Sequence, residues 1–255
     1  MSNDVAITRF CSFLCDYACE LIAMGASGLR IQRNIERMAG HAGCECLLDF
    51  SRSTANIQLT SREYHATAYC NKLVPHRGIN FSKIRLLSSL SWDYADGLID
   101  ADTAYRRFED IIKGKSLNGS VVRLLTCCAN ASFCELFGGD AISMAVVFAA
   151  TYVGFWVKQF LLSKQMNVYI VFGISSLVAA LLSSCVYIFH LGSTPDIAFG
   201  TSVLYLVPGI PYLNSVCDLV TGHQRLGMER IFDALNLTIA LSLGLCGAMT
   251  IMNIA

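Results

Sequence analysis

The second half of the chain contains four apolar segments, each about as long as a membrane-spanning helix. A spanning helix needs about 20 apolar residues, within a range of about 17 to 25. The segments cover residues 141–162, 168–189, 197–217 and 234–255. Their single charged side chain, Lys158, lies close enough to the end of its segment for the ammonium group to reach the polar interface. The sequence therefore predicts an α-helical integral membrane protein.

A fifth segment, residues 121–137, is harder to assign because it contains Arg123 and Glu135. Cytoplasmic loops of membrane proteins carry an excess of Lys and Arg, and this rule decides the assignment. If all five segments span and the N-terminus is cytosolic, the two outer loops are residues 138–140 and 190–196, which contain no Lys or Arg. We therefore predict about five transmembrane helices, with the N-terminus in the cytosol and the C-terminus outside.

The first 116 residues differ from the rest in polarity. Of the 19 Lys and Arg residues, 14 precede position 116 and five follow it. The whole chain is only 15% charged, against about 25% in a soluble domain. Charged residues within the first 25 positions exclude a signal peptide, and a net charge of zero without a dense basic stretch argues against a nucleic-acid partner. We predict a cytosolic domain over residues 1–116 and a transmembrane helical bundle over residues 117–255.

The cytosolic half alternates between helical and strand-like patterns. Apolar residues follow the helical period from Ile7 to Ile22, and further helical stretches are bounded by glycines. Short alternating or apolar runs separated by Ser, Thr and Arg indicate strands. Predicted helices cover residues 7–22, 29–39, 81–96 and 102–113, and predicted strands cover residues 46–50, 55–59 and 65–70. The predicted fold of this half is α+β with a small sheet.

The chain has twelve cysteines, a number that first suggests a disulfide scaffold. Three of them lie on one helical stripe: Cys11, Cys15 and Cys19. Consecutive turns of one helix are poor disulfide partners, and buried Cys behaves as a small hydrophobe, so we interpret these thiols as reduced packing residues. His41, Cys44 and Cys46 offer three ligands at irregular spacing, which favours a helix end running into a strand over a zinc site. We expect no metal and no cofactor.

Two stretches and a short element form a recognisable pattern. The first stretch, residues 25–39, reads GASGLRIQRNIERMA, and the second, residues 207–218, reads VPGIPYLNSVCD. The second is followed by Gly222 and by GMER at residues 227–230, and LFGG precedes the second segment at residues 136–139. In this order, and over nearly the whole chain, they resemble the threonine/serine exporter family, specifically the large component of its two-subunit form.

The resemblance implies secondary export of small metabolites across the bacterial inner membrane, driven by an ion gradient that we expect to be the proton gradient. It implies threonine, serine or dicarboxylates such as succinate as substrates. Full-length members carry a second hydrophobic half that this chain lacks, so the resemblance implies a separate, smaller membrane subunit. We expect a hetero-oligomer in the membrane, with homo-oligomers also open.

The fourth segment contains the most specific candidate for a transport path. Pro208, Gly209 and Pro211 lie in its middle, and proline removes a backbone donor and clashes with the preceding turn, so the helix should break or kink there. Transporters use broken helices to bind substrate near the membrane midplane, whereas a simple structural kink is the alternative. Asn214 and Asp218 lie four residues apart, on one face beneath the break. Asp218 is a candidate substrate or proton ligand, or an ordinary interfacial carboxylate.

A second group of candidates surrounds the first outer loop. Glu135 is an ionisable residue inside a predicted span, which by default suggests a functional site, although it lies near enough to the loop to reach outer water. Gly138, Gly139 and Asp140 follow it. We include Glu135 and Asp140 as candidate proton-carrying carboxylates of the pathway.

Two other function classes remain as alternatives, a membrane-anchored hydrolase and a non-transporting scaffold. A hydrolase needs a nucleophile, a base and an oxyanion site that converge. The scattered Ser51, Ser61, His65 and His76 form no recognisable motif of this kind. One span is enough to anchor an enzyme, so five spans rich in small residues favour a transport path, and we expect no enzymatic activity.

Overall fold

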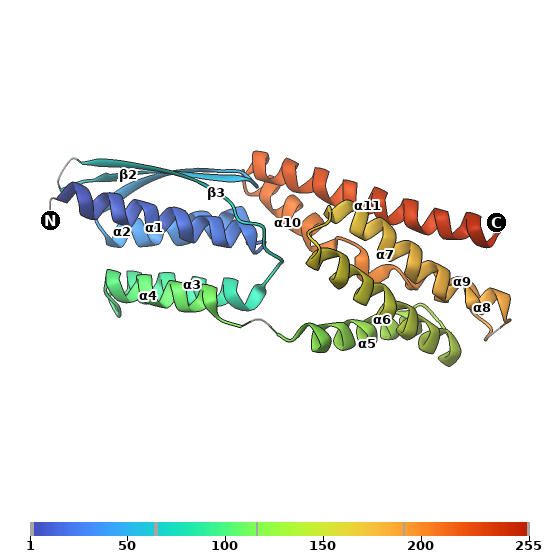
Figure 1. The fold of residues 1–255 in the computed structure, drawn as a ribbon. Helices are drawn as coiled ribbons and strands as arrows, with labels where there is room; N and C mark the ends of the chain where they lie inside the picture. The colour runs from blue at the N-terminus through green and yellow to red at the C-terminus, as the bar shows by residue number, and fades with distance from the viewer. Residues whose placement is uncertain (1–2, 64–65, 116, 191, 254–255) are drawn as a thin grey trace. The chain divides into compact units, whose positions relative to one another are not determined.

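The computed structural model is mostly helical, with one three-stranded sheet (Figure 1). It describes residues 3–63, 66–115, 117–190 and 192–253. The chain forms two compact units. Unit 1 comprises Met1–Lys115 and Ile210–Phe232, and unit 2 comprises Ser116–Gly209 and Asp233–Ala255. Whether residues 1–116 form a separate cytosolic domain stays a prediction.

Unit 1 begins with a helix pair, a sheet and a second helix pair. These elements are α1 (Asn3–Ala23), α2 (Gly28–His41), β1 (Cys44–Phe50), β2 (Thr54–Ser61), β3 (Thr67–Leu73), α3 (Phe81–Ala95) and α4 (Ala101–Lys113). The strands are antiparallel in the order β1-β2-β3. The α+β prediction is confirmed, with all three strands and all four helices present. The predicted start of the third strand at His65 lies outside the described residues.

The sheet buries one face against α1, because its residues alternate between the two faces. On β2 the inward residues Ala55, Ile57 and Leu59 are buried, and α1 runs alongside this sheet (Figure 1). The Cys15 thiol of α1 donates to the Ala55 carbonyl oxygen at 3.3 Å. All twelve cysteines are free thiols, and Cys11, Cys15 and Cys19 are buried, so the packing interpretation of this stripe is confirmed.

The second segment of unit 1 is a tight helical hairpin. It consists of α10 (Gly209–Val220) and the first part of α11 (Gln224–Met252). The turn between them contains Gly222, whose φ of +89° favours glycine. A Cβ added at Gly227 would lie 2.8 Å from the Leu219 Cγ atom, so the two helices touch there. Leu226 is 1% exposed and belongs to the same hydrophobic core as α1 and the sheet.

Unit 2 is a helical bundle. Its elements are α5 (Gly119–Leu136), α6 (Ala141–Ser163), α7 (Val168–Ser183), α8 (Cys185–Ile188), α9 (Pro195–Thr201), the 3-10 helix η1 (Leu204–Leu206) and the later part of α11. Small residues allow close packing, as expected for helices in lipid. A side chain at Gly244 would collide with the Ser176 hydroxyl, and that hydroxyl donates to the Leu241 carbonyl oxygen at 2.9 Å.

Within the described part of the chain, three helices are long and apolar enough to cross a membrane. They are Ala141–Ser163, Val168–Ile188 and Gln224–Met252. A fourth span is possible if the bent pair Pro195–Leu206 and Gly209–Val220 counts as one. The predicted first span forms the helix α5 but is not among these candidates, because Arg123, Asn130 and Glu135 lower its hydropathy.

Two predicted spans differ from the structure in their limits. The segment 197–217 is not one helix, because the chain breaks after η1 and resumes at Gly209. The last helix begins at Gln224 rather than at residue 234. Its added turns carry Arg230, whose charge made the sequence look like a loop, and packing in unit 1 holds these turns helical.

Candidate functional site

The predicted helix break occurs at Val207 and Pro208. Pro208 is buried between the end of η1 and the start of α10, and Gly209 is exposed. The Gly209 N–H donates to the Val207 carbonyl oxygen at 2.8 Å, which closes a tight turn in place of a helical bond. Proline has no N–H and cannot continue the helix through this point. Pro211 lies within the first turn of α10, where its missing donor costs nothing.

Asn214 and Asp218 share the inward face of α10, as the spacing predicts, and both contact the turn that joins α1 to α2. The Asn214 amide donates to the Gly25 carbonyl oxygen at 2.8 Å. The Asp218 carboxylate is fully buried, and its Oδ1 accepts from the Gly28 N–H at 2.7 Å. These contacts join positions about 190 residues apart within unit 1.

Arg230 of α11 completes this arrangement. Its Nη1 forms an ion pair with Asp218 Oδ2, and its Nη2 donates to the Ala26 carbonyl oxygen at 2.7 Å. The Arg230 side chain is only 9% exposed. We call the set Gly25, Ala26, Gly28, Asn214, Asp218 and Arg230 the junction cluster. It joins the turn before α2 to both helices of the α10–α11 hairpin.

Local backbone and sterics explain why glycines stand in this turn. Gly25 has a φ of +84°, which disfavours any side chain. Gly28 begins α2, so its N–H is one of the unpaired donors at a helix N-terminus, where the helix dipole also favours a carboxylate. A Cβ at Gly28 would lie 2.7 Å from Cγ of the His223 ring. His223 is held in turn by Gln32 Oε1, at 2.9 Å from its Nε2.

The electrostatics of the junction cluster indicate a structural clamp. Both carboxylate oxygens of Asp218 are occupied, one by Arg230 and one by the Gly28 N–H. A buried ion pair is strongly destabilised when one partner is removed, by about 3–5 kcal/mol, because the other charge stays buried and uncompensated. Asp218 therefore holds the α10–α11 hairpin against the turn, and a role for it as a substrate or proton ligand stays a prediction.

The candidates Gly138, Gly139 and Asp140 lie in unit 2 and form a helix-to-helix turn. Gly138, with a φ of +89°, ends α5, and a Cβ at Gly139 would lie 2.5 Å from the Cys134 thiol. Asp140 caps α6 by accepting from the Ser143 N–H at 2.7 Å and also accepts from the Ser193 N–H at 2.6 Å.

These hydrogen bonds have an electrostatic consequence for Asp140. The Ser143 N–H and then the Ser193 N–H stabilise the carboxylate and hold the pKa of Asp140 well below its usual range. A carboxyl group that stays ionised is poorly suited to carry a proton. Glu135 is exposed on the last turn of α5. Their roles in a pathway stay predictions.

Two buried polar residues with specific partners were not among the residues predicted from the sequence. Arg230 was visible in the stretch 227–230, but as a basic residue near the cytosolic face and not as the partner of Asp218. In unit 2, Asn130 is 2% exposed, and its amide donates to the Thr151 hydroxyl at 2.7 Å and to the Thr201 carbonyl oxygen at 3.0 Å. An amide inside an apolar helix was the available signal.

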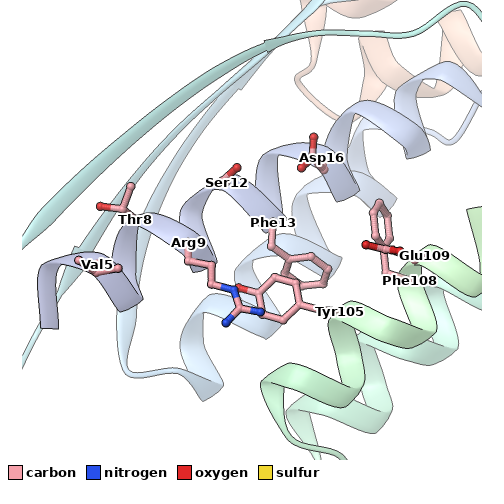
Figure 2. Close-up of a pocket in the computed structure, with 9 residues that line it drawn as sticks. All are labelled: Val5, Thr8, Arg9, Ser12, Phe13, Asp16, Tyr105, Phe108 and Glu109. Carbon is pink, nitrogen blue, oxygen red and sulfur yellow. The ribbon is translucent and has the colours of Figure 1, made fainter. Parts of the chain in front are cut away.

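An open groove of about 600 Å³ lies between α1 and α4 in unit 1 (Figure 2). Aromatic side chains and charged groups line it together. Its charged groups already have partners: Arg9 pairs with Asp102 at 3.3 Å, and Glu109 pairs with Lys113 at 2.6 Å. The groove contains none of the residues predicted for transport. Ser51, a candidate nucleophile of the hydrolase alternative, instead accepts from the Thr54 N–H at 3.1 Å in the β1–β2 turn.

Several candidate spans and small-residue packing indicate a multi-pass membrane protein, and a span broken at proline is typical of the transporter class. The chain belongs to the family described as "Putative threonine/serine exporter", whose model matches residues 12–252. It is 28% identical over 250 residues to a "Probable succinate transporter subunit YjjP" of Klebsiella aerogenes, covering 98% of this chain and 95% of the relative. The protein of the same name from Escherichia coli is 26% identical over 249 residues, with 96% and 94% covered. No solved structure matches the chain.

Proposed function

We propose that the chain is one subunit of a secondary exporter that moves small amino acids or small carboxylates out across the bacterial inner membrane. The family match over residues 12–252 carries this proposal. The relatives' names speak of a succinate transporter subunit, which favours a small dicarboxylate as the first substrate to test, ahead of threonine and serine. A second, smaller membrane subunit completes the exporter, proton movement drives it, and it is not an enzyme.

The proposed topology has five spans, with the N-terminus inside and the C-terminus outside. Here α5 serves as the first span, although it is less apolar than the others. Leu124, Leu125 and Phe133 are exposed on its surface, which suits contact with lipid. Arg123 lies near its cytosolic end, where its guanidinium packs over the Tyr152 ring at 4.6 Å from the centroid.

The junction cluster supports a mechanical role for the N-terminal region. Within unit 1 the hairpin that follows the helix break is bonded to the turn before α2 through Asn214, Asp218 and Arg230. A displacement of α10 during transport would therefore move α2 and the sheet with it. We propose that the N-terminal region moves as one body with the second half of the broken helix.

Transport is tested with purified protein and its smaller partner subunit in liposomes loaded with labelled succinate, threonine or serine. An imposed proton gradient should drive efflux of at least one of them, and a protonophore should abolish it. If both subunits are present and folded, and efflux is independent of the gradient and no faster than from loaded liposomes without protein, the proposed function is overturned.

A further inference from the structure

Lys158 is a cation of unit 2 that has no carboxylate partner among the described residues. Lys158 is on α6, five residues before the helix ends at Ser163. Its ammonium packs over the Phe172 ring at 4.5 Å from the centroid and over Phe155 at 5.6 Å. Within the described residues, Lys158 belongs to none of the salt bridges. An ammonium group inside a span without a carboxylate is costly and indicates a functional site.

Two buried hydroxyl groups of unit 2 also lack a hydrogen-bond partner among the described residues. Ser175 on α7 is 0% exposed, and neither its hydroxyl nor that of Tyr205 on η1 has a hydrogen-bond partner in the described part of the chain. A serine inside a helix normally bonds a carbonyl oxygen of the preceding turn, as Ser176 does with Gly173. A buried donor left unbonded costs free energy and calls for an explanation such as a missing ligand.

Helix geometry places these three groups along one interface. Gly154 lies one turn before Lys158 on α6, and a Cβ there would collide with the Tyr205 hydroxyl. The same position lies 3.3 Å from the Ser175 carbonyl oxygen of α7. Phe172, which contacts the ammonium, precedes Ser175 by one turn. Lys158, Ser175 and the Tyr205 hydroxyl, which reaches α6 from η1, therefore lie within about one helical turn of Gly154 or Phe172.

A neighbouring polar group shows that buried polar side chains in unit 2 can be satisfied internally. About one turn before Gly154 on α6, the Thr151 hydroxyl accepts from the Asn130 amide, which also donates to the Thr201 carbonyl oxygen. The Asn130 amide N–H groups therefore find acceptors within unit 2. Lys158, Ser175 and Tyr205 differ because each offers a donor for which the described residues supply no acceptor.

We infer that Lys158, Ser175 and Tyr205 form a binding site for the carboxylate of a small solute. The ammonium would pair with the carboxylate, and the two hydroxyls would donate to its oxygens or to a polar group next to it. The inference rests on the proposed transport function and names the site of its substrate. It assigns Lys158 a role beyond the snorkelling that its position on the helix suggests.

The test measures equilibrium binding of labelled succinate and threonine to the exporter in nanodiscs, together with efflux from liposomes. Lys158→Met should raise the Kd at least about tenfold, since a hydrogen bond to a charged group is lost, and Lys158→Arg should retain part of the affinity. Lys164→Met is the matched control, because Lys164 packs over Phe160 at 5.7 Å but is exposed at the end of α6. Its Kd should stay within about twofold of the wild type.

Ser175→Ala and Tyr205→Phe remove the hydroxyls without changing charge, and each should raise the Kd several-fold. If Lys158→Met fails to accumulate as folded protein, these two variants test the proposed binding site. If the wild-type exporter binds and exports a probe, and the Kd of these variants is unchanged, the site is overturned and the transport function is not. A wild-type exporter that neither binds nor moves any probe would overturn the proposed function first, and the site with it.

Discussion

Removing the charge of Asp218 should destabilise unit 1 more than any other single polar substitution proposed here. Asp218→Asn keeps an acceptor for the Gly28 N–H but leaves Arg230 buried without a counter-charge. Breaking a buried pair in this way costs about 3–5 kcal/mol. At about 2–4 °C per kcal/mol for a unit of this size, the Tm should fall by about 6 °C or more. Asp218→Ala should cost more, because the Gly28 N–H also loses its acceptor.

The chain's two tryptophans allow this to be measured in unit 1 alone. Trp92 lies on α3 in unit 1, and Trp156 lies on α6 in unit 2. In a Trp156→Phe background, the thermal unfolding of detergent-solubilised protein followed by fluorescence therefore reports on unit 1. The control is Glu109→Gln, which breaks an exposed pair with Lys113 and should leave the Tm unchanged.

A double-mutant cycle separates the ion pair from other effects of the substitutions. Asp218→Leu combined with Arg230→Met replaces both charges by apolar groups, and this often restores stability because no buried charge remains. The coupling free energy between the two positions should be about 1–3 kcal/mol. Additive effects of the two substitutions, or an unchanged Tm in Asp218→Asn, would refute the clamp.

Three further predictions concern other positions. In Asp140→Asn the Tm should fall relative to the wild type at neutral pH. Because the folded pKa of Asp140 is lowered, the stabilisation by its carboxylate is present above the unfolded pKa of about 3.9 and is lost as the pH falls below it towards the folded pKa. A Tm difference between wild type and variant that does not shrink on acidification would contradict the capping role. Gly28→Ala should destabilise the protein and be partly rescued by His223→Ala, because a Cβ there meets the imidazole. Burial raises the pKa of Cys11 to about 12, so iodoacetamide at pH 8 should label this thiol only after unfolding, as mass spectrometry can show.

Much of the architecture was predictable because it depends on local periodicity and segment length. A period of 3.6 or 2 residues identifies the elements of the N-terminal region, and runs of about 20 apolar residues identify spans. The break at Pro208 followed from the chemistry of proline alone. The start of α11 was missed because its first turns carry charges that only packing makes compatible with a continuous helix.

The contacts of the candidate residues were decided only by tertiary structure. Asp218 and Asn214 looked like ligands on one face of a broken helix, and that face does exist. The partners of that face are the turn before α2 and Arg230, and no local pattern encodes contacts across about 190 residues. In the same way, the sequence placed Lys158 near a helix end, but only the fold shows its ammonium against aromatic rings. By itself, the sequence determined the membrane class, the elements and the family resemblance, because these depend on local pattern. The partner of each buried charge depends on which elements pack together, and the tertiary structure alone determined that.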